Sequence, residues 1–238
     1  MWPLYDENRP RRKPIVNYTL IAINVAVFIY FYFQGYTAFQ KAIIQYGEIP
    51  IYILKGERLY TLITSMFMHG GWMHLIGNMV YLYIFGDNVE DAFGHLGYLA
   101  FYIIAGLGAS LVHLLSLFLM PPDLLYYSLR VPAVGASGAI SGVLGAYMIL
   151  YPRARIRTLV VYYVITIISI PAYYYIGFWF LYQLLMGMLA IEIPSGVAFW
   201  AHVGGFVTGV LIVKLLGIRP PRRRKIIYYY HIPVEPYY

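Results

Sequence analysis

The sequence predicts an all-α membrane protein, built as a bundle of six transmembrane helices. Hydrophobic residues make up 61% of the 238 residues and charged residues only 11%, and the mean hydropathy is +0.66. A soluble globular protein carries about 25% charged residues, so we expect lipid to surround most of this chain. The chain has no cysteine. The composition therefore excludes a disulfide framework, thiolate chemistry and a cysteine-ligated metal.

Six apolar runs are candidates to cross the bilayer core, for which a helix needs about 20 residues. The predicted spans are Ile15–Phe33, Trp72–Phe85, Tyr98–Met120, Ser137–Tyr151, Pro171–Leu189 and Val197–Leu216. The intervening stretch 34–71 is too polar to cross and too aromatic for an ordinary solvated loop. The apolar run 158–170 is followed by Pro171, and we interpret it as a partial or interfacial segment of a loop. No small-residue cleavage site follows the first run, which favours an uncleaved span over a signal peptide.

The basic residues predict the orientation of these spans. Three clusters precede the first span, follow the fourth and follow the sixth: Arg9, Arg11, Arg12 and Lys13; Arg153, Arg155 and Arg157; and Arg219, Arg222, Arg223, Arg224 and Lys225. With six spans all three clusters, 12 of 17 cations, lie on one side, whereas a seventh span at 158–170 would place the last cluster outside. Basic loops of this kind orient membrane proteins, so the net charge of +7 does not indicate nucleic-acid binding.

We therefore predict a multi-pass protein of the cell membrane with both termini in the cytoplasm. Its domain organisation is a basic N-terminal tail 1–14, a membrane domain 15–216, and a basic, tyrosine-rich C-terminal tail 217–238. The acidic stretch GDNVEDAFGH then lies on the inner side without a cation of its own, which the orientation rule tolerates because acidic residues contribute little to it.

Four polar residues lie at membrane depth, where a polar side chain is costly and needs a partner or a function. His74 and Asn78 are four residues apart, on one face in the outer half of the second span. Ser137 begins the fourth span and His202 lies in the outer part of the sixth. All four side chains are therefore expected in one layer beneath the outer surface of the membrane. We expect the site that they form to open to the outer face.

Small residues indicate how the helices that carry Ser137 and His202 meet. Pairs that allow close helix approach in lipid occur on both helices: Gly138 and Gly142, and Gly205 and Gly209. A neighbouring imidazole is what activates a serine nucleophile, and no carboxylate lies at this depth, so a dyad fits better than a triad. The residues alone leave other interpretations open, because small residues in membrane helices mostly serve packing. A lone histidine in the membrane more often bonds a backbone carbonyl, and a His and an Asn on one face could equally hold two helices together.

No metal or cofactor is expected. His69 and His74 are five residues apart, which takes them off a single helical face, and no carboxylate is nearby. The metalloprotease pattern HExxH is absent. His113, in the third span, is interpreted as a structural histidine.

Three stretches together resemble the rhomboid family of intramembrane serine proteases: HGGWMHLIGNM (69–79), GASGAISG (135–142) and AHVGGFVTG (201–209). The lead-in GERLYTLITSMFMHG is similar to the first loop of that family, which lies partly embedded in the outer leaflet. The resemblance implies that Ser137 is the nucleophile and His202 the general base. It also implies an oxyanion hole of Asn78, His74 and the Ser137 backbone N–H, with His69 as a structural residue of the first loop.

The resemblance further implies the substrates and the helix contacts. Substrates would be single-span membrane proteins that enter near the fifth helix and are cut near the outer end of their span; partners are thus transmembrane proteins and the lipid bilayer, without nucleic acid or metal. The glycines expected to support the site are Gly135, Gly138, Gly142, Gly205 and Gly209. Phe178, Trp179 and Tyr182 are candidates for a substrate gate, and the loop with Gly196 for a cap.

Two features depart from the family pattern. Ser141 replaces an aromatic residue that often supports the catalytic histidine, so His202 has to be positioned otherwise, for example by another aromatic residue. Tyr60 and Thr61 replace a Trp-Arg pair of the first loop. The alternative functions are a catalytically inactive relative that binds membrane helices and a small transporter or channel, although the sequence shows no internal repeat of the kind transporters contain.

Overall fold

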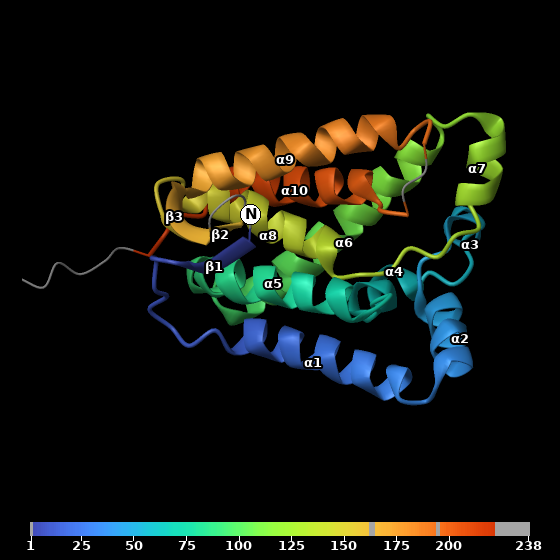
Figure 1. The fold of residues 1–238 in the computed structure, drawn as a ribbon, viewed down its shortest axis with the longest axis horizontal. Helices are drawn as coiled ribbons and strands as arrows, with labels where there is room; N and C mark the ends of the chain where they lie inside the picture. The colour runs from blue at the N-terminus through green and yellow to red at the C-terminus, as the bar shows by residue number, and fades with distance from the viewer. Residues whose placement is uncertain (1, 162–164, 194–195, 222–238) are drawn as a thin grey trace, which may run out of the picture.

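The computed structural model describes residues 2–161, 165–193 and 196–221, and most of them are helical (Figure 1). The long helices are α1 (Ile15–Tyr32), α5 (Trp72–Phe93), α6 (His95–Leu117), α8 (Ser137–Leu150), α9 (Ala172–Leu189) and α10 (Phe199–Leu215). Shorter helices lie toward one end of this bundle: α2 (Tyr36–Tyr46), α3 (Pro50–Leu54), α4 (Thr61–Thr64), the 3-10 helix η1 (Ser65–Phe67) and α7 (Pro122–Ser128). A small β-sheet lies at the opposite end.

Local sequence explains where the central helices begin and end. Gly94 separates α5 from α6 with a φ of 73°, a left-handed conformation that glycine adopts without steric cost. Pro171 directly precedes α9, a position where its missing N–H donor costs nothing. Pro152 disfavours helical geometry in the residue before it, and α8 ends at Leu150.

The bundle is apolar both inside and on much of its surface. In the part of the chain that the structure describes, α1 and α6 are each long and apolar enough to cross a membrane. The apolar helices α8 and α10 are shorter, with 14 and 17 residues. α8 is central, because it packs against α5, α6, α9 and α10. The outer helices expose large apolar side chains such as Ile23, Leu111 and Phe178.

The sheet differs from the sequence expectation of an all-α protein. Three antiparallel strands form it in the order β1 (Trp2–Asp6), β2 (Arg155–Val161) and β3 (Ile165–Pro171). The run 158–170, expected to be a partial or interfacial segment of a loop, is thus mostly a pair of strands, and part of the N-terminal tail pairs with it at Trp2 and Leu159. Valine, isoleucine and threonine favour extended backbone, which explains the strands. Residues 162–164, the basic residues 222–225 and the tyrosine-rich end lie outside the described residues.

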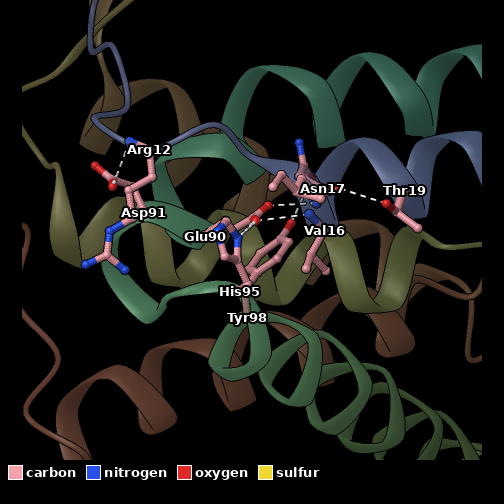
Figure 2. Close-up of polar contacts among 9 residues, drawn as sticks. Arg12, Val16, Asn17, Thr19, Glu90, Asp91, His95 and Tyr98 are labelled. Atoms are coloured by element: carbon pink, nitrogen blue, oxygen red, sulfur yellow. Dashed lines mark hydrogen bonds and ion pairs between the residues drawn. The ribbon is translucent and has the colours of Figure 1, made fainter.

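The acidic stretch at the end of α5 holds the beginning of α1 (Figure 2). Glu90, which is buried, accepts hydrogen bonds from the backbone N–H groups of Val16 at 3.0 Å and Asn17 at 2.7 Å, and His95 Nδ1 lies 2.5 Å from its Oε1. The start of α1 has no side-chain cap within its own segment, so Glu90 satisfies N–H groups that a helix start leaves without partners. A carboxylate at this end also suits the helix dipole.

Neighbouring residues extend this junction. Asp91 accepts from the backbone N–H groups of Arg11 and Arg12, and the Tyr98 hydroxyl donates to Asn17 Oδ1 at 2.8 Å. Two of the acidic groups that we expected to lie without a cation, Glu90 and Asp91, therefore accept hydrogen bonds from N–H groups of the segment that enters α1.

Candidate active site

Glycines place α8 and α10 in direct backbone contact. A Cβ atom added at Gly205 would overlap the carbonyl oxygen of Gly138, and one added at Gly209 would overlap that of Gly142. A Cβ at Gly142 would also lie 2.5 Å from the Cβ of Ala105 on α6. Larger residues at these positions would push the helices apart, so the glycines set the distance between the side chains on α8 and α10.

This contact brings Ser137 and His202 together. The Ser137 hydroxyl lies 2.9 Å from His202 Nε2. Ser137 is the first residue of α8, and His202 lies in the first turn of α10. His202 Nδ1 lies 2.8 Å from Oε1 of Gln183 on α9. If Nε2 accepts the serine proton, a neutral imidazole carries its own proton on Nδ1 and donates it to the glutamine oxygen. The three side chains thus form one hydrogen-bonded chain across three helices.

Two further donors from α5 lie beside Ser137. Asn78 Nδ2 is buried and has no hydrogen-bond partner in the structure. His74 Nδ1 is placed to accept a long hydrogen bond of 3.4 Å from the Gly70 N–H, which leaves the protonated Nε2 of a neutral ring as a donor. A buried amide without a partner is costly, so Asn78 is ready to donate to an oxygen that enters the site.

The backbone before Ser137 runs past these donors. Gly135 has a φ of 128°, which L-residues rarely adopt. A Cβ there would lie 2.7 Å from His74 Nε2 and 3.6 Å from Asn78 Nδ2. Both steric reasons require glycine at this position. The approach places the start of α8 directly against the donors of α5.

These groups line a cavity of about 380 Å³. Its walls include the α5 residues Met73, Gly77 and Tyr81 and the α9 residues Trp179 and Gln183, together with the Ser137, His202, Asn78 and His74 side chains. Gly196, the expected cap residue, also lines it, whereas residues 194–195 of that loop lie outside the described residues. The cavity is large enough for water and for part of a peptide chain to reach the serine.

The other predicted residues lie around this cavity. His69 is buried, and its ring packs edge-on against His74 with the centroids 5.1 Å apart. Burial lowers the pKa of His69 to about 3, so this ring is neutral at ordinary pH. Of the three gate candidates, Trp179 lines the cavity, whereas Phe178 and Tyr182 are exposed on the outside of α9.

Gln183 was not predicted from the sequence, and Trp179, which was predicted as a gate residue, is the aromatic residue that lies beside His202. The Trp179 ring lies 6.1 Å from the His202 ring at an interplanar angle of 35°. Ser141, which replaces the expected aromatic, instead donates to the Ser137 carbonyl at 2.6 Å. The signal for Gln183 was present, because it is a polar residue within a predicted span and falls under the same cost argument as the four residues singled out.

Glu48 is a second residue that the sequence analysis missed. It lies in the loop between α2 and α3, is buried, and accepts a hydrogen bond of 2.6 Å from Ser110 on α6. Its backbone pairs in both directions with Ala133. Burial raises the pKa of its carboxyl group, although the Ser110 hydrogen bond acts the other way. Within the described residues, no group of three His, Asp or Glu side chains is arranged to hold a metal ion.

Comparison with known proteins shows which family the sequence is similar to. Residues 56–219 match the family model described as Rhomboid domain. The chain is 32% identical over 169 residues to RHOMBOID-like protein 4 of Arabidopsis thaliana, an alignment that covers 71% of this chain and 36% of that protein. It is 26% identical over 208 residues to Rhomboid protease GluP of Bacillus subtilis (strain 168), an alignment that covers 87% of this chain and 36% of that protein.

A third relative is Rhomboid protein 1, mitochondrial, of Saccharomyces cerevisiae, which is 29% identical over 204 residues, covering 82% of this chain and 51% of that protein. The matched region thus spans about a third to a half of the length of these relatives.

Proposed function

This chain belongs to the rhomboid family, and on that basis we propose that it is an intramembrane serine endopeptidase. The observation that carries the proposal is the hydrogen bond of 2.9 Å between the Ser137 hydroxyl and His202 Nε2, inside a cavity that also holds the unpartnered amide of Asn78. A serine, a base and an oxyanion donor are the parts that acyl transfer needs. One of the relatives, from Bacillus subtilis, is named a rhomboid protease.

In the first half of the reaction His202 Nε2 removes the hydroxyl proton while Ser137 Oγ attacks the scissile carbonyl carbon. The imidazolium then gives this proton to the leaving nitrogen, the C–N bond breaks, and an acyl-enzyme remains. In the second half a water molecule in the cavity replaces the amine. His202 takes its proton, the hydroxide attacks the ester, and the proton returns to Ser137 as the acid leaves.

The negative oxygen that forms in each half needs donors fixed in advance. The Asn78 amide, His74 Nε2 and the Ser137 backbone N–H are proposed to supply them. This N–H belongs to the first turn of α8, where the helix leaves its N–H groups without intrahelical partners. Such a donor typically lowers the rate-limiting barrier by on the order of 3 kcal/mol, because it needs no reorganisation in a site of low dielectric constant.

For the membrane topology we propose six spans, formed by α1, α5, α6, α8, α9 and α10, with both termini in the cytoplasm. Within the described residues, the basic residues before α1, after α8 and after α10 belong to the segments at the sheet end of the bundle. The short helices α2, α3 and α7 would then lie at the outer face. Ser137 and His202 near the starts of α8 and α10 are at that outer end.

Substrates are proposed to be single-span membrane proteins that enter between α5 and α9. The support is that residues of both helices line the cavity, including Tyr81 from α5 and Trp179 from α9. A substrate span that lies along this gap could present its outer end to Ser137 after local unwinding, since helical hydrogen bonds otherwise hide the peptide carbonyls from attack.

The test is cleavage of a single-span reporter by the purified protein in liposomes, with Ser137→Ala and His202→Ala as paired variants. We expect cleavage by the wild type and none by either variant, with all three showing the same melting temperature. Ser141→Ala is the matched control, because it removes a neighbouring serine hydroxyl of α8 that bonds to the backbone rather than to His202. If the reporter is bound but not cut by the wild type, the chain is a helix-binding member of the family and the proposal is wrong.

A further inference from the structure

Gln183 is a polar side chain on the buried face of α9, where the other buried residues include Ile176 and Gly187. Its neighbours Tyr182 and Leu185 are 53% and 54% exposed, whereas Gln183 is 4% exposed. Burying an amide is costly unless it is hydrogen-bonded, and the partner here is His202, with 2.8 Å between Gln183 Oε1 and His202 Nδ1. The residue therefore points at the ring nitrogen opposite the one that faces Ser137.

We propose that Gln183 is a positioning residue that holds His202 in the one tautomer able to act as a base. The inference deepens the proposed protease function and rests on it. A neutral imidazole has a proton on either Nδ1 or Nε2, and only the form with the proton on Nδ1 can take a proton from Ser137. The carbonyl oxygen of Gln183 accepts hydrogen bonds and cannot donate them, so it stabilises the proton on Nδ1.

The same contact acts when the imidazole becomes charged. After proton transfer both ring nitrogens carry protons, and the Nδ1–H keeps its acceptor while Nε2–H faces the leaving group. A hydrogen bond to a charged group is about twice as strong as one between neutral groups, so Gln183 favours the charged intermediate over the resting state. It does this as a neutral dipole, which costs less to bury at membrane depth than a carboxylate would.

The groups that position the His202 ring come from α9 and not from α8. Ser141 on α8 bonds to the Ser137 carbonyl and does not contact the imidazole by hydrogen bonding. Trp179 lies one turn before Gln183 on α9 and packs beside the ring, with the centroids 6.1 Å apart. One helix thus supplies both a flat surface for the imidazole and an acceptor for its Nδ1–H, which makes α9 a part of the catalytic apparatus as well as a wall of the cavity.

Among the described residues, two other titratable groups interact electrostatically with His202: His74 on α5 and His113 on α6. Their charges would affect the pH at which His202 becomes protonated. Both are retained in the variants below, so a change in pH dependence reports on the contact with Gln183.

The experiment compares Gln183→Leu and Gln183→Glu with the wild type in liposomes, measuring kcat and KM for a single-span reporter from pH 5 to 9. Loss of the acceptor in Gln183→Leu is expected to lower kcat by about 10- to 100-fold with KM nearly unchanged. Gln183→Glu keeps an acceptor and adds a charge that stabilises the protonated imidazole. It is expected to keep most of the maximal rate, with the acidic limb of the pH profile moved up by about 1 pH unit or more.

Asn24→Leu is the matched control, because Asn24 is also a fully buried amide but lies on α1, where its Nδ2 bonds to the Leu20 carbonyl. It is expected to lower the melting temperature and leave the pH profile unchanged. If both Gln183 variants only lose stability, as Asn24→Leu does, and keep the wild-type kcat and pH profile, Gln183 is a packing residue and the inference is wrong. If the wild type itself fails to cleave, the proposed function is refuted, and the inference with it.

Discussion

A hydrogen bond joins α5 and α9 beside the cavity that holds the proposed catalytic residues. The hydroxyl groups of Tyr81 and Tyr175 lie 2.8 Å apart, and Tyr81 lines the cavity. If substrates enter between these helices, this bond has to break before a substrate span reaches Ser137. We therefore predict that Tyr175→Phe, which removes one hydroxyl and keeps the ring, increases kcat/KM for a single-span reporter.

The expected increase in kcat/KM follows from the strength of the hydrogen bond between Tyr81 and Tyr175. A hydrogen bond between two neutral side chains contributes about 0.5–1.5 kcal/mol, which corresponds to an increase of about 2- to 12-fold in the population of the open gap. The ring packing survives the substitution, since Phe85 stacks against the Tyr175 ring with centroids 6.4 Å apart. The increase should therefore come from the hydroxyl alone.

The assay pairs the membrane reporter with a small fluorophosphonate probe that labels Ser137 from the aqueous side. The probe does not pass between α5 and α9, so its labelling rate should stay at the wild-type value. Tyr81→Phe should give the same increase as Tyr175→Phe, and the double variant no more than either one, because the two hydroxyls form one bond. Tyr98→Phe is the control, since it removes a hydroxyl that bonds to Asn17 away from the cavity. An unchanged reporter rate in all three gap variants, or an equal rise in probe labelling, would refute entry at this gap.

Three further predictions concern stability. Glu90→Ala leaves the N–H groups of Val16 and Asn17 without their acceptor and should lower the free energy of unfolding by about 2–6 kcal/mol, at about 1–3 kcal/mol for each group, seen as a lower melting temperature; an unchanged value would contradict the role of the junction. The pKa of Glu48 is raised in the folded protein, so folding stability should fall as the pH rises above the usual carboxyl range, and Glu48→Gln should remove that part of the pH dependence. Gly205→Leu should prevent α8 and α10 from packing and abolish probe labelling, whereas Gly177→Ala, which meets no atom within 4 Å, should be tolerated.

The arrangement of the candidate site was predictable because few polar residues can lie in lipid without a reason. His74, Asn78, Ser137 and His202 stood out on that ground, and the glycine pairs indicated which helices touch. Gln183 was not predicted although the same argument applies to it, because nothing in the sequence links it to the other four residues and it lies in the fifth span, whose aromatic residues indicated a gate. Its partner, Nδ1 of His202, becomes apparent only when the helices are placed in space.

The sheet could not be predicted from local sequence. The run 158–170 is as apolar as a short span, and its two strands, β2 and β3, pair mainly with each other. The other partner of β2 is β1, whose Trp2 pairs with Leu159 although the two residues are far apart in the sequence. The β-branched residues of β2 and β3 were the available signal, but an apolar run of this length is equally compatible with a buried helix until its neighbours are known.

The pairing of β1 with β2 imposes an order on biosynthesis. Residues 2–6 leave the ribosome before residues 155–161, which are made only after α1, α5, α6 and α8. With the proposed topology, β1 waits in the cytoplasm until four crossings are complete, and such a distant contact forms late because of its loop-closure cost. A single helix that failed to cross would deliver β2 to the opposite side of the membrane from β1. Pairing of β1 with β2 therefore requires that the preceding helices cross as proposed. A chain in which one of them failed to cross would keep the β2–β3 pair and leave β1 without its partner strand.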